Sequence, residues 1–250
     1  MIRINQPGLK SFVFYVFGFI FLTLFIYLGI PFFFDYKNNQ SDLERKIFEN
    51  FDLNLSFTSK VKYNIFPSPR LNLKNVEILS FSESSKNIGS VKKVILKIPF
   101  KRLVSLKKLD FDSIELIDAV INIKTSEINN FKNYLNNKAR EKPIQLTKSK
   151  INLLDKTKLL FNIDIKKLRI SGKSLFNKLD LKGRIFDTKI EINYQNKNFN
   201  KNSEKNVEIW LPEIGLNSKL SINPDKKNNE TIYGKVSVFF PNNQIYLDYI

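Results

Sequence analysis

Residues 53–73 read LNLSFTSKVKYNIFPSPRLNL, and their pattern decides the fold. Between positions 53 and 65 an apolar side chain occupies every second position, with Ser59 as the exception. Because successive side chains of a β-strand point to opposite faces, this alternation predicts one strand, or two joined by a hairpin near Ser59, with one continuous apolar face. The residues expected on that face are Leu53, Leu55, Phe57, Val61, Tyr63 and Ile65.

Two prolines follow the alternating run. Pro67 and Pro69 cannot donate ladder hydrogen bonds and have a fixed φ, so they end the strand and make a stiff corner. We define this corner motif by four residues, Phe66, Pro67, Pro69 and Arg70. Alternation resumes after it and changes parity near Asn75, where a bulge or turn would re-aim the apolar face.

An uncharged segment precedes these strands. Residues 11–34 read SFVFYVFGFIFLTLFIYLGIPFFF. About 24 residues at a rise of ~1.5 Å span ~36 Å, enough to cross a hydrocarbon core of ~30 Å. The run is longer than the apolar part of a signal peptide, and no small-x-small cleavage pattern follows it. We predict an uncleaved transmembrane anchor, and we single out as its anchor residues Phe12, Phe14, Phe17, Phe19, Phe21, Leu24, Tyr27 and Leu28.

The orientation of this anchor is expected to leave residues 1–10 in the cytoplasm and the bulk of the chain outside. Lys and Arg residues are nearly balanced on its two sides, so the positive-inside rule gives only a small preference. The chain has a formal net charge of +17, but no compact basic run with interleaved aromatic residues. A nucleic-acid partner is therefore not expected.

The composition argues against an enzyme. The chain has no Cys and no His, which removes disulfides, thiolate and imidazole metal ligands, and the commonest acid–base residue. One acidic cluster, in LDFDSIELIDAV, could in principle serve acid–base chemistry or cation binding. Its members alternate with apolar residues, so a solvated strand face is the favoured interpretation, and neither a cofactor nor a metal is expected. The four residues are Asp110, Asp112, Glu115 and Asp118.

The remaining chain predicts a mainly β protein with short helices. Ser41 and Glu44 fit a capping box, followed by Leu43, Ile47 and Phe51 at helical spacing. A second helix is expected over residues 127–140, and the polar, basic residues 138–150 are expected to form a loop or linker. Short strands separated by Gly and Asn-rich stretches then predict an antiparallel meander.

These elements divide the chain into four predicted parts: a cytoplasmic tail (1–10), the anchor (11–34), a first β domain with two short helices (41–140), and a continuing antiparallel sheet (141–250). The last residue, Ile250, falls inside an apparent strand, which would leave an exposed edge. We therefore expect the sequence to be part of a longer protein.

The order of these elements resembles the N-terminal region of the AsmA family of bacterial envelope proteins. The resemblance lies in the anchor, the alternating strands, FPSPRLNLKNVEI at residues 66–78, and VKKVILKIPFKRLVSLKKLDFDSIELIDAVINI at residues 91–123. The resemblance covers residues 10–123 well, and the later strands share only the general pattern of short alternating strands. The chain is shorter than is usual in that family and richer in Lys and Asn.

Membership of this family would imply a curved, β-taco-like antiparallel sheet with an apolar groove, and a relationship to chorein-like bridge proteins. The candidate lipid-facing residues of such a groove are those of the first alternating run: Leu53, Leu55, Phe57, Val61, Tyr63 and Ile65. It would also imply a single-pass anchor in the bacterial inner membrane with the bulk in the periplasm. The expected function is phospholipid transport between the inner and outer membrane, and outer-membrane biogenesis. The alternative is an envelope scaffold that regulates outer-membrane protein assembly or localisation through contacts with other envelope proteins.

Overall fold

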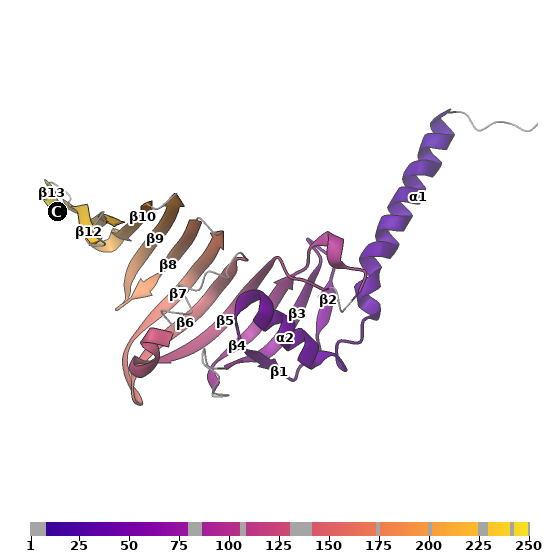
Figure 1. The fold of residues 1–250 in the computed structure, drawn as a ribbon, viewed down its shortest axis with the longest axis horizontal. Coiled ribbons are helices and arrows are strands. Elements are labelled where there is room, and N and C mark those ends of the chain that lie inside the picture. Colours follow the sequence, from indigo (N-terminus) through magenta and orange to yellow (C-terminus); the bar gives the residue numbers. More distant parts are fainter. Residues whose placement is uncertain are drawn as a thin grey trace, which may run out of the picture.

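The computed structural model describes residues 9–79, 87–105, 109–130, 142–173, 176–199, 202–224, 230–240 and 243–249. These residues form one open, curved, 13-stranded sheet with an apolar helix at one end (Figure 1). The fold class predicted from the sequence is therefore confirmed. The helical elements are α1 (Leu9–Gly29), η1 (Ile30–Phe33), α2 (Gln40–Phe51), η2 (Phe100–Arg102), η4 (Thr125–Glu127) and η5 (Pro212–Ile214).

The strands follow one another across the sheet in nearly the order of the sequence. Short loops between sequential neighbours account for this order. The sheet continues without a break past the predicted domain boundary at residue 141. The strands are β1 (Leu55–Phe57), β2 (Lys62–Asn64), β3 (Arg70–Leu79), β4 (Asn87–Lys97), β5 (Ser113–Lys124), β6 (Ile144–Asp155), β7 (Lys158–Lys173), β8 (Phe176–Ile185), β9 (Thr188–Phe199), β10 (Asn202–Leu211), β11 (Leu216–Pro224), β12 (Glu230–Phe240) and β13 (Asn243–Tyr249).

The two halves of the opening stretch do not pair with each other. β1 and β2 both pair with β3, one after the other along its length, so they act as one interrupted strand beside it. The corner motif closes the hairpin between β2 and β3, where Asn64 lies opposite Arg70. The option of a hairpin at Ser59 is thus wrong. The hydroxyl of Ser59 instead donates to the carbonyl of Lys74 in β3.

One pairing departs from the antiparallel pattern. β5 and β6 run parallel, with Ile114 opposite Ile144 and Ile123 opposite Leu153. A parallel pair needs a crossover connection of a dozen or more residues, which residues 125–143 provide. The linker predicted at 138–150 is wrong for residues 144–150, which belong to β6. The helix predicted at 127–140 begins after η4, and its residues 131–140 lie outside the described part of the chain.

Helix α2 covers the first strands. Leu43, Ile47 and Phe51 are almost completely buried and belong to the same core as the apolar residues of β1–β5. We call the face of the sheet that packs against α2 the inner face. The helix begins at Gln40, so Ser41 is not its N-cap and the predicted capping box does not form. Glu44 accepts a hydrogen bond from the backbone N–H of Phe57 in β1 instead, at 3.2 Å.

The contact between α2 and the sheet can be tested with two substitutions on one helix. Ile47→Ala removes a fully buried side chain and should lower the free energy of unfolding by about 2–5 kcal/mol, because it leaves a cavity. Phe48→Ala, on the exposed side of α2, should cost much less. Urea unfolding of the detergent-solubilised protein measures both. Equal losses would contradict the packing described.

A row of backbone irregularities crosses the sheet. Asn75 in β3, Asp118 in β5 and Lys148 in β6 all have left-handed φ values, of 50°, 53° and 51°. The flanking pairs place them at matched positions on β3–β6, and the row ends at a register shift between Ile165 and Lys167 in β7. We call this line the bulge row.

The bulge row reverses the parity of each strand it crosses. In β5, Leu116 faces inward before Asp118 and Ala119 faces inward after it. Without the reversal, a period of two would send every later apolar residue of the strand to solvent. The parity changes in the sequence near Asn75 and within β5 are therefore one feature of the sheet. The same change at Lys148 interrupts the alternation of β6, so the sequence pattern did not predict this strand.

The bulge row predicts an unusual sensitivity at Lys148. Lys148→Val places a β-branched residue in a left-handed conformation and should destabilise the protein by about 1–2 kcal/mol. Lys167→Val, at an exposed position on β7, should be close to neutral because Val favours strands. Thermal unfolding of both variants checks this. A neutral Lys148→Val would contradict the left-handed backbone.

Candidate functional site

An apolar row runs across the inner face at right angles to the strands. It passes through directly opposed residues of β3–β10: Leu73, Val94, Leu116, Leu146, Leu168, Leu181, Ile192 and Ile209. The exposed fraction of these side chains rises along the row, from 0% at Leu73 to 5% at Leu146 and 9% at Leu181. Ile192 and Ile209 are half-buried. The row therefore begins in a sealed core and ends at an accessible surface.

The accessible part extends over several strands. We call the inner face of β9–β12 the open zone. In Figure 1, α2 lies over the first strands and does not reach β8–β12, where the short η5 turn is the described helical element in contact with β9, β11 and β12. The apolar residues of the open zone are half-buried, and most of them oppose another apolar residue on a neighbouring strand, although Ser218 lies between Ile209 and Val236. They are Ile190, Ile192, Tyr194, Val207, Ile209, Leu211, Leu216, Leu220, Val236 and Val238.

The residues that the sequence predicted to face lipid lie elsewhere. Leu53, Leu55, Phe57, Val61 and Tyr63 are buried, and Ile65 is half-buried against the same core. They lie in β1, β2 and the flanking segments, where α2 and η1 fill the space in front of them. The alternation correctly predicted that these residues share one apolar face. Because α2 packs over this part of the face, however, they form a buried core. Sequence analysis recognised the later strands without identifying them as the uncovered ones.

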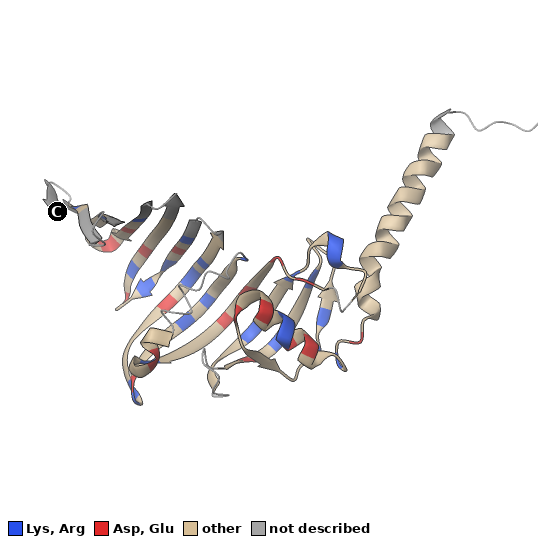
Figure 2. Cartoon of the chain, viewed as in Figure 1, with Lys and Arg blue, Asp and Glu red and all other residues tan. Residues whose placement is uncertain are grey.

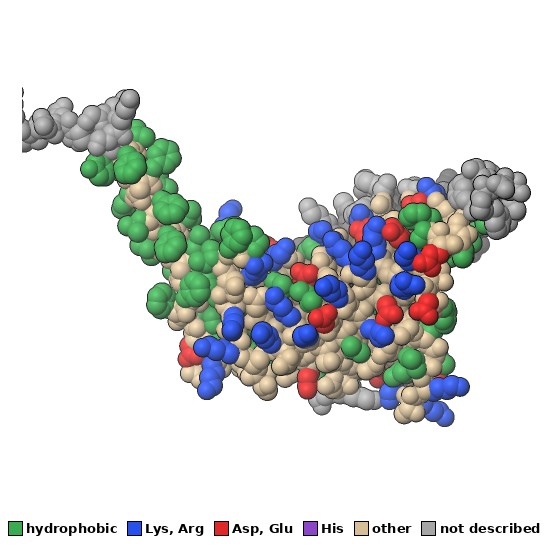
Figure 3. Space-filling model, turned by 180° about the vertical axis from the view of Figure 1, so that it is seen from behind, with side chains coloured by type: hydrophobic (Ala, Val, Ile, Leu, Met, Phe, Trp, Pro, Cys, Tyr) green, Lys and Arg blue, Asp and Glu red, His purple; other side chains and the backbone are tan. Residues whose placement is uncertain are grey.

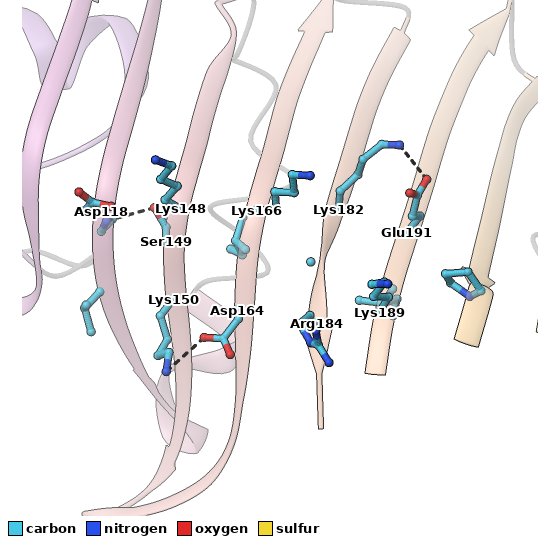
Figure 4. A pocket seen from close by; sticks show the side chains of 16 residues that line it. Asp118, Lys148, Ser149, Lys150, Asp164, Lys166, Lys182, Arg184, Lys189 and Glu191 are labelled. Atoms are coloured by element: carbon cyan, nitrogen blue, oxygen red, sulfur yellow. Dashed lines mark hydrogen bonds and ion pairs between the residues drawn. The ribbon is translucent and has the colours of Figure 1, made fainter. Parts of the chain in front are cut away.

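The outer face, opposite α2, is polar. Figure 3 shows Lys, Arg, Asp and Glu side chains spread over it, in contrast to the apolar anchor. A hollow of about 860 Å³ lies on the bulge row and is lined in part by Gly183, where a Cβ would collide with the backbone carbonyl of Asp164. Ion pairs join neighbouring strands there, Lys150 with Asp164 at 3.1 Å and Lys182 with Glu191 at 2.9 Å (Figure 4). This charged lining is unsuited to hydrocarbon.

The acidic cluster predicted as a solvated strand face does not converge on one point. Glu115 accepts hydrogen bonds from Gln145 and Thr147 of β6, at 3.0 and 2.8 Å. Asp118 lies on the bulge row, 4.0 Å from Lys92, and Asp112 is exposed. Within the described residues, no group of three or more acidic side chains is arranged to hold a metal ion.

Asp110 instead ties two segments together. Lys142, just before β6, donates hydrogen bonds to the Asp110 carboxylate and to the side chain of Asn50 in α2. Burial by itself would raise the pKa of Asp110. The hydrogen bonds from Lys142 and from the Phe111 N–H, with the positive charge of Lys142, outweigh it and hold this pKa below its ordinary value.

The lowered pKa makes this contact pH-dependent. A carboxylate whose pKa is lower in the folded than in the unfolded state stabilises the fold above its unfolded pKa of about 4 and loses that contribution as the pH falls through the folded value. Asp110→Asn should therefore destabilise the protein more at pH 7 than at pH 3, by urea unfolding. Asp112→Asn is the control. An equal effect of Asp110→Asn at both pH values would refute the pairing with Lys142.

The apolar helix has the exposure expected of a membrane span. The stretch Phe12–Phe33 has a mean hydropathy of 2.4, and its most apolar 18-residue window is not buried against the protein. Figure 2 shows charges on the strands and on α2, and α1 carries none beyond Lys10. Of the predicted anchor residues, Tyr27 and Leu28 pack against the sheet domain. The others are exposed: Phe12, Phe14, Phe17, Phe19, Phe21 and Leu24.

The end of the anchor is bound to the sheet. The Tyr63 hydroxyl donates to the carbonyl of Leu28 at 2.9 Å, and its ring packs edge-on against Phe32 with centroids 4.9 Å apart. Burial raises the pKa of Tyr63 to about 12, with a contribution from Tyr27, so this hydroxyl keeps its proton at neutral pH. The Tyr27 hydroxyl donates to the carbonyl of Phe100.

The corner motif lies at this same end of the sheet. Phe66 is 83% exposed, Pro69 is buried, and Arg70 donates to the carbonyl of Phe66 across the turn. The Phe66–Pro67 peptide bond is cis. A second hollow, of about 780 Å³, opens nearby between η1 and the β1–β2 edge, and Lys37 and Lys60 are among the residues that line it.

These features define a class of protein: one long sheet, two-faced, tied to an apolar helix that can cross a membrane. The chain belongs to the AsmA family, whose model matches residues 8–243. A search of curated proteins gives no match. Family membership and the apolar helix together suggest a membrane-anchored envelope protein.

Proposed function

We propose that this protein binds phospholipid acyl chains along its inner face and takes part in phospholipid transport between the inner and outer membrane, and so in outer-membrane biogenesis. In this proposal the anchor spans the inner membrane once and the sheet lies in the periplasm. No chemical step is required, and we propose no catalytic residue, cofactor or nucleic-acid partner. Other envelope proteins remain proposed partners.

The observation that carries the proposal is the gradient of exposure along the apolar row. The first strands bury their apolar residues under α2, while Ile192 and Ile209 continue the same row half-exposed. Leaving hydrocarbon in water costs about 0.8 kcal/mol per CH₂, so an uncovered apolar row is stabilised by any hydrocarbon that covers it.

The dimensions suit a lipid tail. At about 4.8 Å between strands, the apolar row from β3 to β10 is roughly 34 Å long, and the open zone continues over β11 and β12. A head group at the rim would stay in water, beside the polar outer face. The surface therefore needs no dedicated charged site for the head group.

The test compares adjacent residues on opposite faces. A photo-crosslinking amino acid replaces Ile192 or Ile209 on the inner face, with Asn193 and Trp210 as controls on the outer face. After irradiation of membranes that contain the full chain, mass spectrometry should find phospholipid adducts at 192 and 209, several-fold above those at 193 and 210.

Two other outcomes decide against lipid transport. Equal adducts on both faces would mean that lipid contact is nonspecific. Adducts with a protein at 192 and 209 in place of lipid would favour the envelope-scaffold alternative, in which the open zone is covered by a partner.

A further inference from the structure

The anchored end of the sheet carries exposed aromatic residues that the proposed groove does not use. By the anchored end we mean the corner motif, the η2 turn and the last turns of α1. Phe66 is 83% exposed at the tip of the β2–β3 hairpin, and Phe100 is 54% exposed at the start of η2. Phe66 comes shortly before β3, and Phe100 comes shortly after β4. The start of β3 and the end of β4 lie side by side, because Arg70 is opposite Lys97.

The anchor fixes the height of this end relative to the membrane. The hydroxyl of Tyr27 donates to the backbone carbonyl of Phe100, so the η2 turn lies beside Tyr27. Tyr27 is inside the apolar stretch Phe12–Phe33, six residues before its end. Because Ile30–Phe33 form the 3-10 helix η1, a rise of ~1.5–2 Å per residue puts Tyr27, to which Phe100 is bonded, about 9–12 Å inside the end of that stretch.

A bilayer that covers the apolar stretch must then reach the anchored end. Residues 12–26 of the helix are exposed, whereas residues 27–30 are partly covered by the sheet domain. We propose that the anchored end is a second membrane contact, in which Phe66 and Phe100 enter the head-group layer of the bilayer that the anchor spans. Aromatic side chains favour this interface, where an apolar ring can leave water while the backbone stays near polar groups.

The charges near the two phenylalanines fit the same partner. Arg70 and Lys97 occupy directly opposed positions on β3 and β4, and like charges so placed repel each other. Lys101 is exposed in the η2 turn beside Phe100. Lipid phosphates at the bilayer surface supply the negative charge that would offset this repulsion.

This contact is independent of the proposed function, because it concerns how the domain sits on its own membrane. It would hold the inner face at one orientation to the bilayer even if no lipid entered the open zone. Phe186 provides a matched control, because it is also a phenylalanine in a tight turn and is 74% exposed. It joins β8 to β9, far along the sheet from α1 (Figure 1).

The experiment uses single-tryptophan variants of the full chain. Trp210 is the chain's one tryptophan, so Trp210→Phe gives a silent background into which Phe66→Trp, Phe100→Trp or Phe186→Trp is introduced. The proteins are reconstituted in vesicles whose lipids carry bromine near the head-group end of the acyl chain. Bromine quenches tryptophan only at short range.

The tryptophans at 66 and 100 should lose about half of their emission, as expected for side chains at the interface, while that at 186 should be unaffected. Circular dichroism confirms that each variant is folded. Quenching at 66 or 100 no stronger than at 186 would overturn the proposal. A blue-shifted but unquenched emission would also overturn it, and would indicate that a protein, such as a second copy of the chain, covers this end.

Discussion

An apolar face must be kept from water, and in the part of this chain that the structure describes, the short helix α2 does so for the first strands of a single sheet layer. Ile47 and Phe51 of α2 are essentially inaccessible, and the apolar residues of β3–β5 beneath them are equally buried. The same apolar row continues past the helix without changing its chemistry. The core and the candidate lipid surface therefore have side chains of the same kind. They differ in whether a helix packs over them.

The bulge row is what keeps this face continuous. At Asn75, Asp118 and Lys148 a left-handed residue lets each strand change parity without leaving the sheet. The residues gained on the other face are mostly polar, and Lys148 and Lys92 point there. Alignment of the irregularities across strands allows the sheet to bend as a unit, so that curvature, a polar outer face and an apolar inner face arise together.

The contacts between the anchor and the sheet fix the orientation of the two faces relative to the anchor. Tyr63 of β2 donates to Leu28 at the end of α1 and packs against Phe32 of η1, and Tyr27 of α1 donates to Phe100 in the η2 turn. Burial keeps the Tyr63 hydroxyl protonated and able to donate. A sheet held in this way cannot turn freely about its anchor, so the membrane and the inner face have a set relationship. That relationship is what a path for lipid between a bilayer and a groove would require.

The sequence by itself determined the anchor, the strand-rich body, the inward residues of α2 and the turn at the corner motif, because each depends on local spacing or on the backbone chemistry of proline. It also showed the parity changes, though not that they align. Tertiary structure alone decided which part of the apolar face is covered. Leu55 and Ile192 have the same alternating surroundings, yet one is buried and the other half-exposed. Burial depends on which element packs against a strand, and the alternation of residues within the strand does not show this. The parallel pairing of β6 with β5 depends on a long crossover, which that alternation does not show either.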